Sequence, residues 1–167
     1  GDTLVGFGGN DTILGGDGSD WIDAIGTGDV SISAGLGDDT VVMADSLNAS
    51  DVTVMGGDGN TDYLVFTDDS LAGDNLAKVS GFEYISITGG VVETLGSANI
   101  LDQGATVDAS SADFLHMDLQ QETSDGVYLI GSGFDDLVTL GGGNDTVNLG
   151  EGNDFINAAN ASDDSIN

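Results

Sequence analysis

The aspartates of this chain recur behind glycine-rich turns, at a spacing that suits the binding of a hard cation. The clearest copy is residues 15–23, with the sequence GGDGSDWID. Residues 6–14 precede it without a gap, and residues 140–148 run directly into residues 149–157 in the same pattern. Ca²⁺ takes six to eight oxygen ligands from carboxylates and backbone carbonyls. Aspartates set among glycine carbonyls therefore predict calcium chemistry.

The same spacing predicts the elements that hold these aspartates in place. The aspartates that close a turn are Asp2, Asp11, Asp20, Asp39, Asp62, Asp136, Asp145, Asp154 and Asp164. Two residues after each lies an aliphatic side chain, namely Leu4, Ile13, Ile22, Val41, Leu64, Val138, Val147, Ile156 and Ile166. A six-residue turn followed by a three-residue strand accounts for this period, with the aliphatic residue pointing inward.

Nine residues then make half a coil, so successive turns fall on opposite edges and turns about two repeats apart stack. Each stacked pair would offer two carboxylates with glycine carbonyls between them, and the glycines allow positive φ and close approach of the backbone to an ion. The expected pairs are Asp2 with Asp20, Asp20 with Asp39, Asp136 with Asp154, and Asp145 with Asp164. Several Ca²⁺ ions are expected as the cofactor.

The predicted metal-site residues include both the turn aspartates and the turn glycines. They are Asp2, Gly6, Gly8, Asn10, Asp11, Gly16, Gly18, Asp20, Asp29, Gly35, Gly37, Asp39, Gly57, Gly59, Asp62, Gly131, Gly133, Asp136, Gly141, Gly143, Asp145, Gly150, Gly152, Asp154 and Asp164. Asp62 follows a turn one residue too long, and Asp29 lies in an irregular insertion. The alternative is that these aspartates cap the turns of a metal-free solenoid.

The expected fold is all-β, a right-handed parallel β-roll or β-solenoid with calcium-binding glycine-rich turns. Residues 1–66 hold repeats with breaks, residues 67–130 form an irregular segment with longer turns, and residues 131–167 resume the repeats. We expect one continuous solenoid across all three. A helix around residues 71–79 is an alternative within the middle segment.

Composition limits the partners. The 167 residues carry 30 acidic side chains against one cation, Lys78, for a formal net charge of −29. No basic patch can form, which excludes nucleic acid, and an anionic membrane would repel the chain. No apolar run approaches the length of a membrane span, and there is no cysteine. Hydrophobic residues nevertheless make up 39% and follow a period. We therefore expect folding to require multivalent cations, which can replace disulfides as crosslinks.

The repeat segments resemble the RTX (repeats-in-toxin) family of calcium-binding β-rolls. The resemblance implies export by type I secretion from a Gram-negative bacterium and folding outside the cell in millimolar calcium. Residues 79–89, VSGFEYISITG, and residues 107–110, VDAS, resemble segments of RTX-type surface-layer proteins and large adhesins. The chain opens and closes inside a repeat, so we expect it to be part of a longer protein.

The remaining residues favour a structural role over catalysis. His116 is the only histidine and has no cysteine or second histidine as a companion ligand. We expect it on the outer face of a strand, and Trp21 likewise to face outward. The predicted function is a calcium-dependent structural segment of an extracellular surface layer, filament or adhesin on a bacterial cell, and not an enzyme. The alternative is the folding and export module of a secreted enzyme or toxin. Expected partners are calcium, further copies or neighbouring segments, and a surface glycan.

Overall fold

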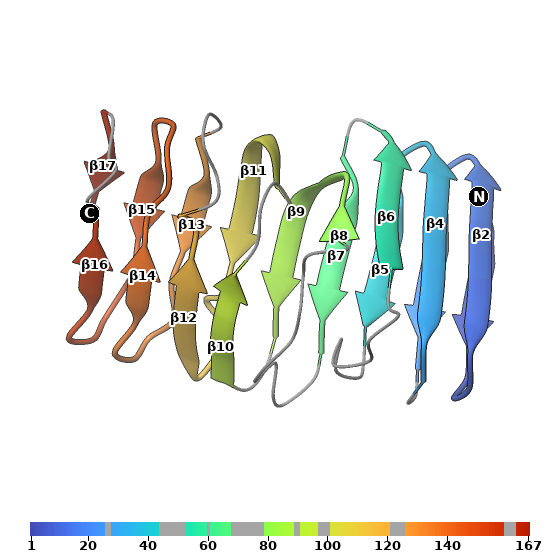
Figure 1. The fold of residues 1–167 in the computed structure, drawn as a ribbon, viewed down its shortest axis with the longest axis horizontal. Helices are drawn as coiled ribbons and strands as arrows, with labels where there is room; N and C mark the ends of the chain where they lie inside the picture. Colours follow the sequence, from blue (N-terminus) through green and yellow to red (C-terminus); the bar gives the residue numbers. More distant parts are fainter. Residues whose placement is uncertain are drawn as a thin grey trace.

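The chain folds as a stack of parallel coils, each contributing one strand to either side of a flattened solenoid (Figure 1). The structure is a computed structural model that describes residues 1–25, 28–43, 53–59, 61–67, 79–88, 91–96, 101–120, 126–158 and 163–167. Within those ranges all regular secondary-structure elements are β-strands. The predicted all-β parallel solenoid is therefore confirmed.

One nine-stranded sheet extends along the whole stack. It contains β1 (Thr3–Gly6), β3 (Trp21–Ala24), β5 (Thr40–Met43), β7 (Tyr63–Phe66), β9 (Phe82–Ile87), β11 (Leu101–Asp108), β13 (Tyr128–Ile130), β15 (Thr146–Asn148) and β17 (Ser165–Ile166). The strands of this sheet are the odd-numbered ones, in sequence order. Each therefore pairs with the equivalent strand of the next coil and not with the strand that follows it in the sequence.

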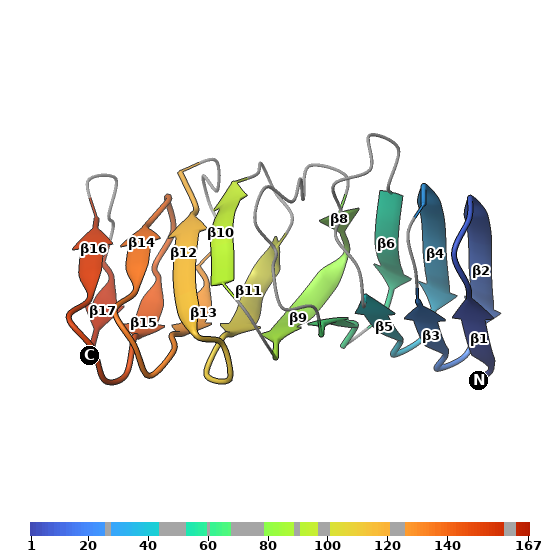
Figure 2. The same ribbon diagram turned by 90° about the horizontal axis from the view of Figure 1, so that it is seen from below.

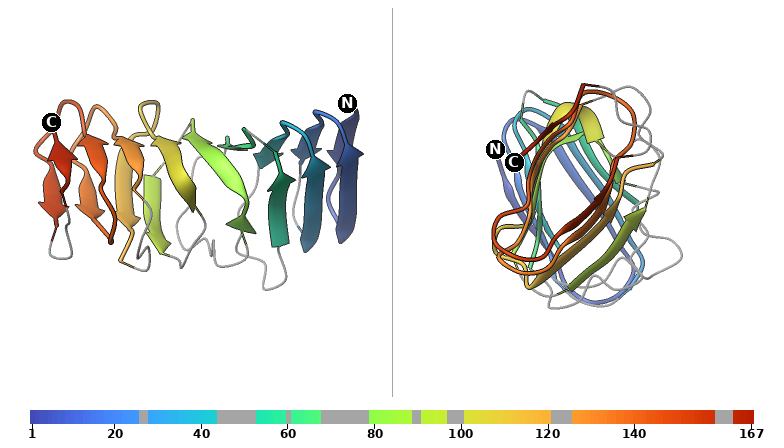
Figure 3. Two further views of the ribbon diagram at one scale, coloured as in Figure 1. Left: turned by 90° about the horizontal axis from the view of Figure 1, so that it is seen from above. Right: turned by 90° about the vertical axis from the view of Figure 1, so that its left-hand side faces the viewer.

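Two four-stranded sheets form the other side of the solenoid, as Figures 2 and 3 show from three directions. The first contains β2 (Asp11–Asp17), β4 (Val30–Leu36), β6 (Thr53–Asp58) and β8 (Val79–Ser80). The second contains β10 (Val91–Gly96), β12 (Phe114–Asp118), β14 (Leu137–Thr139) and β16 (Phe155–Asn157). The nine-stranded sheet lies opposite both of them and is the sheet that is continuous along the domain.

The core lies between the two layers and consists of the aliphatic residues that the repeat predicts. Ile22, Val41, Leu64, Val138 and Val147 are fully buried. The corresponding residues in coils near the ends of the stack have a neighbour on fewer sides, and they are less buried. The exposed fraction of Ile166, in the last strand of the nine-stranded sheet, reaches 49%.

Successive side chains along each strand point to opposite faces of the sheet, so every second side chain faces solvent. Trp21 is 48% exposed while its neighbour Ile22 is fully buried. His116 lies outward between the buried Leu115 and Met117. Both outward predictions are confirmed.

Two expectations about the middle of the chain are not decided. Residues 71–78, most of the alternative helix, lie outside the described residues, and Val79 begins β8. The zone boundaries at residues 66 and 130 stay predictions, although the nine-stranded sheet has strands on both sides of each. The described residues contain no helix able to cross a membrane.

Candidate metal centre

A column of carboxylates follows one edge of the nine-stranded sheet. The strand register aligns one residue of every coil, from Thr3 in β1 and Trp21 in β3 to Ser165 in β17. The residues that immediately precede the aligned ones are Asp2, Asp20, Asp39, Asp62, Glu83, Ala105, Val127, Asp145 and Asp164. We call the seven acidic members the acidic column. Ala105 and Val127 divide it into a stretch of five and a stretch of two. Sequence analysis missed Glu83 because it considered only aspartates, although Ile85 follows Glu83 at the repeat spacing.

After Asp2, each carboxylate in the first stretch accepts a hydrogen bond from the backbone of the preceding coil. Asp2 N donates to Asp20 Oδ1 at 2.5 Å, Asp20 N to Asp39 Oδ1 at 2.8 Å, and Asp39 N to Asp62 Oδ1 at 2.8 Å. Asp62 N donates in turn to Glu83 Oε2 at 2.7 Å. The predicted stacking of Asp2, Asp20 and Asp39 is therefore present, and it continues for two further coils.

The second stretch has the same geometry. Asp145 N donates to Asp164 Oδ1 at 3.0 Å, and Val127 N donates to Asp145 Oδ1 at 3.0 Å. Val127 is itself buried and apolar, so no carboxylate faces Asp145 from that side of the column.

The second oxygen of these aspartates is buried without a partner. Oδ2 of Asp20, Asp39, Asp62, Asp145 and Asp164 has no hydrogen bond. Leaving a buried acceptor unsatisfied costs about 1–3 kcal/mol, and more for a charged group. Five such atoms at one edge of one sheet match what a cation-binding row requires.

Glycines keep open the space between these carboxylates and the carbonyls of the next coil. A Cβ added at Gly15 would lie 2.8 Å from Asp20 Oδ2 and would collide with the carbonyl oxygen of Ala34. A Cβ at Gly59 would lie 2.7 Å from Asp62 Oδ1 and would again collide with a carbonyl of the neighbouring coil. A carboxylate oxygen and a backbone carbonyl therefore converge on each of these positions.

The turn glycines also stack in columns with positive φ. Gly16, Gly35 and Gly57 share one register position and have φ of 102°, 123° and 123°. Gly18 and Gly37 have φ of 104° and 120°. Residues other than glycine rarely adopt this backbone conformation, so the shape of the turns depends on these glycines.

Burial and crowding of like charges act on the same carboxylates. Burial, together with the charges of Glu83 and Asp39, raises the pKa of Asp62 to about 6. Burial likewise raises the pKa of Asp39 and of Asp145. A bound cation would oppose both effects, because it favours the ionised carboxylate.

No group of three or more His, Cys, Asp or Glu side chains gathers around one point in the described part of the chain. Each candidate site in the acidic column therefore has fewer than three carboxylates, and the remaining ligands must be backbone carbonyls or water. Ca²⁺ accepts such mixed oxygen sets, whereas a site made only of side chains would need more acidic groups. The residues present fit calcium on these terms.

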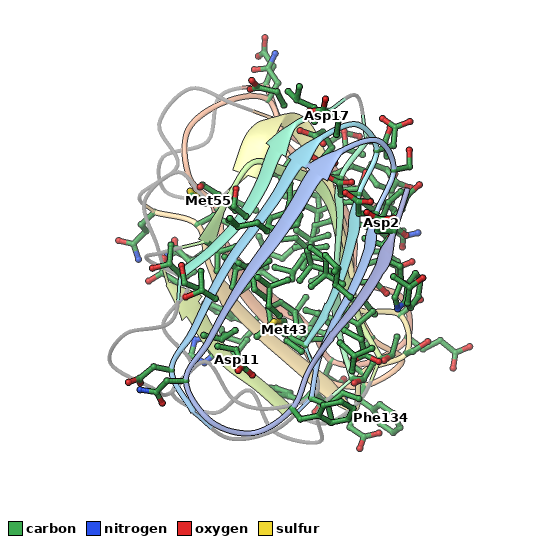
Figure 4. All side chains as sticks on the ribbon, turned by 90° about the vertical axis from the view of Figure 1, so that its right-hand side faces the viewer. Asp2, Asp11, Asp17, Met43, Met55 and Phe134 are labelled. Carbon is green, nitrogen blue, oxygen red and sulfur yellow. The ribbon has the colours of Figure 1, made fainter. Side chains whose placement is uncertain are left out.

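The first turns of the opposite edge are less regular, and Figure 4 shows Asp11 across the coil from Asp2 and Asp17. Register pairs Asp11 with Val30, so Asp29 lies one position outside this column. Asp29 N donates to Asn10 Oδ1 at 3.4 Å, and Asn10 Nδ2 donates to Asp29 Oδ2 at 3.3 Å. A Cβ at Gly6 would lie 3.2 Å from Asp11 Oδ2.

The later turns of that edge contain Asp136 and Asp154. Asp136 N donates to Asp154 Oδ1 at 2.9 Å, as the predicted pair requires. Both oxygens of Asp136, however, already have partners within the protein, chiefly Ser132. Sequence analysis did not single out Ser132, although it occupies a position that is glycine in the regular turns.

The predicted glycines of the C-terminal repeats differ among themselves. Gly143, Gly150 and Gly152 have φ of 97°, 92° and 146°. A Cβ at Gly152 would lie 2.7 Å from Asp154 Oδ1, and one at Gly131 would collide with Asp136 Oδ2. The other predicted glycines are Gly133 and Gly141 in these repeats and Gly8 near the N-terminus; a Cβ at Gly133 would meet nothing within 4 Å.

Parallel coils with glycine-rich turns and rows of buried carboxylates define the class of calcium-binding β-rolls. The family model of the RTX calcium-binding nonapeptide repeat, of the haemolysin type, matches this chain in four copies, at residues 1–24, 26–42 and 128–157. Residues 1–24, 26–42 and 128–157 are therefore RTX calcium-binding repeats, and calcium is the ion that such repeats bind. No curated protein and no solved structure matched the chain.

Proposed function

We propose that this domain is a calcium-stiffened structural segment of a bacterial surface layer, extracellular filament or adhesin. The acidic column supports this most directly, because its unpaired carboxylate oxygens lie along the same sheet that spans the whole stack. A protein whose charge is neutralised coil by coil becomes a stiff rod, as a spacer or lattice element requires.

In this proposal Asp20, Asp39 and Asp62 hold calcium through Oδ2, together with carbonyl oxygens of the glycine turns. Asp145 and Asp164 do so in the second stretch. Calcium supplies positive charge and a crosslink between adjacent coils. Carboxylates about 5 Å apart repel each other by roughly 1–3 kcal/mol at intermediate dielectric. Folding and ion binding are therefore coupled, and the chain would fold only after reaching calcium outside the cell.

The outer face of the nine-stranded sheet offers a contact surface for a neutral glycan. One register column there, the outer stripe, consists of Thr3, Trp21, Thr40, Tyr63, Tyr84, Thr106, Tyr128, Thr146 and Ser165. None of these residues is charged, although the chain carries −29. Trp21, Tyr63 and Tyr128 are 48%, 39% and 41% exposed. Exposed apolar side chains in a row mark an interaction surface.

Spacing along the outer stripe favours a repeating ligand. Trp21 and Tyr63 are two coils apart, which is about 9.5 Å at the usual distance between strands. Sugar rings of an extended polysaccharide can stack on aromatic rings at such intervals. Binding to an insoluble neutral polysaccharide in calcium should weaken in Trp21→Ala and persist in Val5→Ala, which alters an exposed residue of β1 outside the stripe. Equal binding by both variants would exclude this surface.

The alternative role is a folding and export module attached to a secreted enzyme or toxin, which the family match equally supports. Electron microscopy of the domain with and without calcium separates the two roles. We expect calcium-dependent filaments or sheets, and none from Asp39→Asn at the same calcium concentration. Monomers at high protein and millimolar calcium would instead favour the module.

A further inference from the structure

One repeat turn differs from the others in the residues that surround its aspartate. Residues 131–136 read GSGFDD, so Ser132 and Phe134 stand where the Asp20 turn has glycine. Asp136 is as buried as Asp20, Asp39, Asp62 and Asp145 of the acidic column, with an exposed fraction of 2%. Burial alone therefore does not distinguish this turn; the partners of its carboxylate do.

Ser132 contacts both oxygens of Asp136. Ser132 N donates to Asp136 Oδ2 at 2.8 Å, and the hydroxyl Oγ donates to Asp136 Oδ1 at 2.6 Å. Oδ1 also accepts from Leu115 N of the preceding coil at 3.0 Å. The Ser132 hydroxyl oxygen in turn accepts from Phe134 N at 3.1 Å. The turn is thus closed by a local network within residues 132–136.

This network leaves Asp136 without the unpaired oxygen that the other buried turn aspartates have. Buried aspartates among the described residues are Asp20, Asp39, Asp62, Asp136 and Asp145, and all except Asp136 have an orphaned Oδ2. Hydrogen bonds to a carboxylate stabilise its charged form, as a cation would. The stabilisation that calcium supplies elsewhere is present here from the protein itself.

The network also opposes an ion at this point. The N–H of Ser132 directs its positive end at Oδ2, so a cation on that oxygen would displace the donor and face its partial charge. Phe134 adds a Cβ and a ring in place of the second turn glycine, and its side chain is 58% exposed. Neither change helps a carbonyl oxygen to approach an ion.

We infer that the Asp136 turn holds no calcium ion and that Ser132 takes the place of the ion. This turn lies within a segment that matches the calcium-binding repeat, so the repeat pattern alone would assign an ion to it. Its structure should persist at calcium concentrations too low for the Asp145 turn, which has the orphaned oxygen. The inference depends on calcium binding by the repeats and not on the surface-layer role.

Hydrogen exchange measured by mass spectrometry on the whole chain tests this by comparing two turns in one molecule. As calcium is lowered, peptides covering residues 131–136 should stay protected at concentrations about tenfold or more below those at which residues 140–145 lose protection. Ser132→Ala should reduce that difference only in part, because it deletes the hydroxyl bonds to Asp136 Oδ1 and from Phe134 N but keeps the backbone donor to Oδ2. Loss of protection by both turns at the same calcium concentration in the wild type would overturn the inference.

Counting bound ions provides a second test that does not depend on exchange. After dialysis against saturating calcium, elemental analysis should find at least one ion fewer in Asp39→Asn than in the wild type. Asp136→Asn should retain the wild-type count. If the folded Asp136→Asn protein loses an ion as Asp39→Asn does, the turn holds calcium and the inference is wrong. If that variant does not fold, the exchange comparison in the wild type still decides.

Discussion

The Asp39 turn and the Asp136 turn place the same residue type at the same position of the repeat, at the same depth of burial. Asp39 accepts one hydrogen bond from the neighbouring coil and keeps Oδ2 unpaired. Asp136 accepts a comparable bond and fills its second oxygen from Ser132. The repeat aspartate is therefore not sufficient to define a calcium ligand. The glycines around it matter as much, because they leave its second oxygen open.

The coils that carry the acidic column also differ from the two coils that interrupt it. Where Asp39 and Asp62 stand in the first coils, the middle coils have Ala105 and Val127, both buried. These coils bury the apolar side chains Val107, Leu115 and Leu129 instead. Burial of apolar area supplies about 25 cal/mol per Å², so the middle can pack without cations while the ends of the column cannot.

Removing calcium should have the largest effect of the changes considered, because the acidic column needs cations to fold and the middle coils do not. Chelation leaves several like charges uncompensated in the acidic column, and we expect most of the β signal in far-UV circular dichroism to disappear and to return in millimolar calcium. Magnesium at equal concentration is the control, because it prefers a smaller octahedral shell. A spectrum that does not change after thorough chelation would contradict calcium-dependent folding.

Asp39→Ala should be the most damaging single change in the column. It removes a carboxylate between two stacked neighbours and leaves the buried Asp20 N–H without its acceptor, at a cost of about 1–3 kcal/mol before any ion is lost. We expect the calcium midpoint for folding to rise by about tenfold or more. Asp113→Ala, at an exposed turn aspartate, carries the same charge change and should leave the midpoint nearly unaltered. Similar midpoints for the two variants would argue against the column as the binding row.

Gly35→Ala tests whether the glycine columns matter independently of charge. Gly35 has φ of 123°, and an added Cβ would collide with the Gly16 carbonyl, so a cost of about 1–3 kcal/mol is expected from backbone strain alone. The thermal midpoint in saturating calcium should fall by several degrees. Gly133→Ala is the matched control, since a Cβ there meets nothing within 4 Å. Equal stability of both variants would show that the turn tolerates side chains.

The smallest effect concerns pH in the absence of calcium. The pKa of Asp62 is raised to about 6 in the folded chain from its ordinary value of 3.8, so between these values the folded state binds more protons than the unfolded state. Stability without calcium should therefore increase as pH falls from 7 toward 5, which urea unfolding with chelator can measure. Asp62→Asn should flatten that dependence. A domain that becomes less stable over this range would show that other groups dominate.

The local repeat was enough to predict the strands, the inward aliphatic residues and the stacking of Asp2, Asp20 and Asp39. The reason is that a nine-residue period specifies both the alternation of side chains and the return of each turn to the same edge. These features depend only on residues near one another in sequence.

The composition of the acidic column was decided by tertiary structure. Glu83 joins it and Asp29 falls one position outside its own column because coils of unequal length are aligned by backbone hydrogen bonds between them. Sequence spacing cannot foresee that alignment where the period changes. The pairing of Ser132 with Asp136 also required the folded turn, since it depends on whether a hydroxyl and an N–H converge on one buried carboxylate. Spacing predicts which aspartates close the turns; their burial and hydrogen-bond partners in three dimensions decide which of them still need an ion.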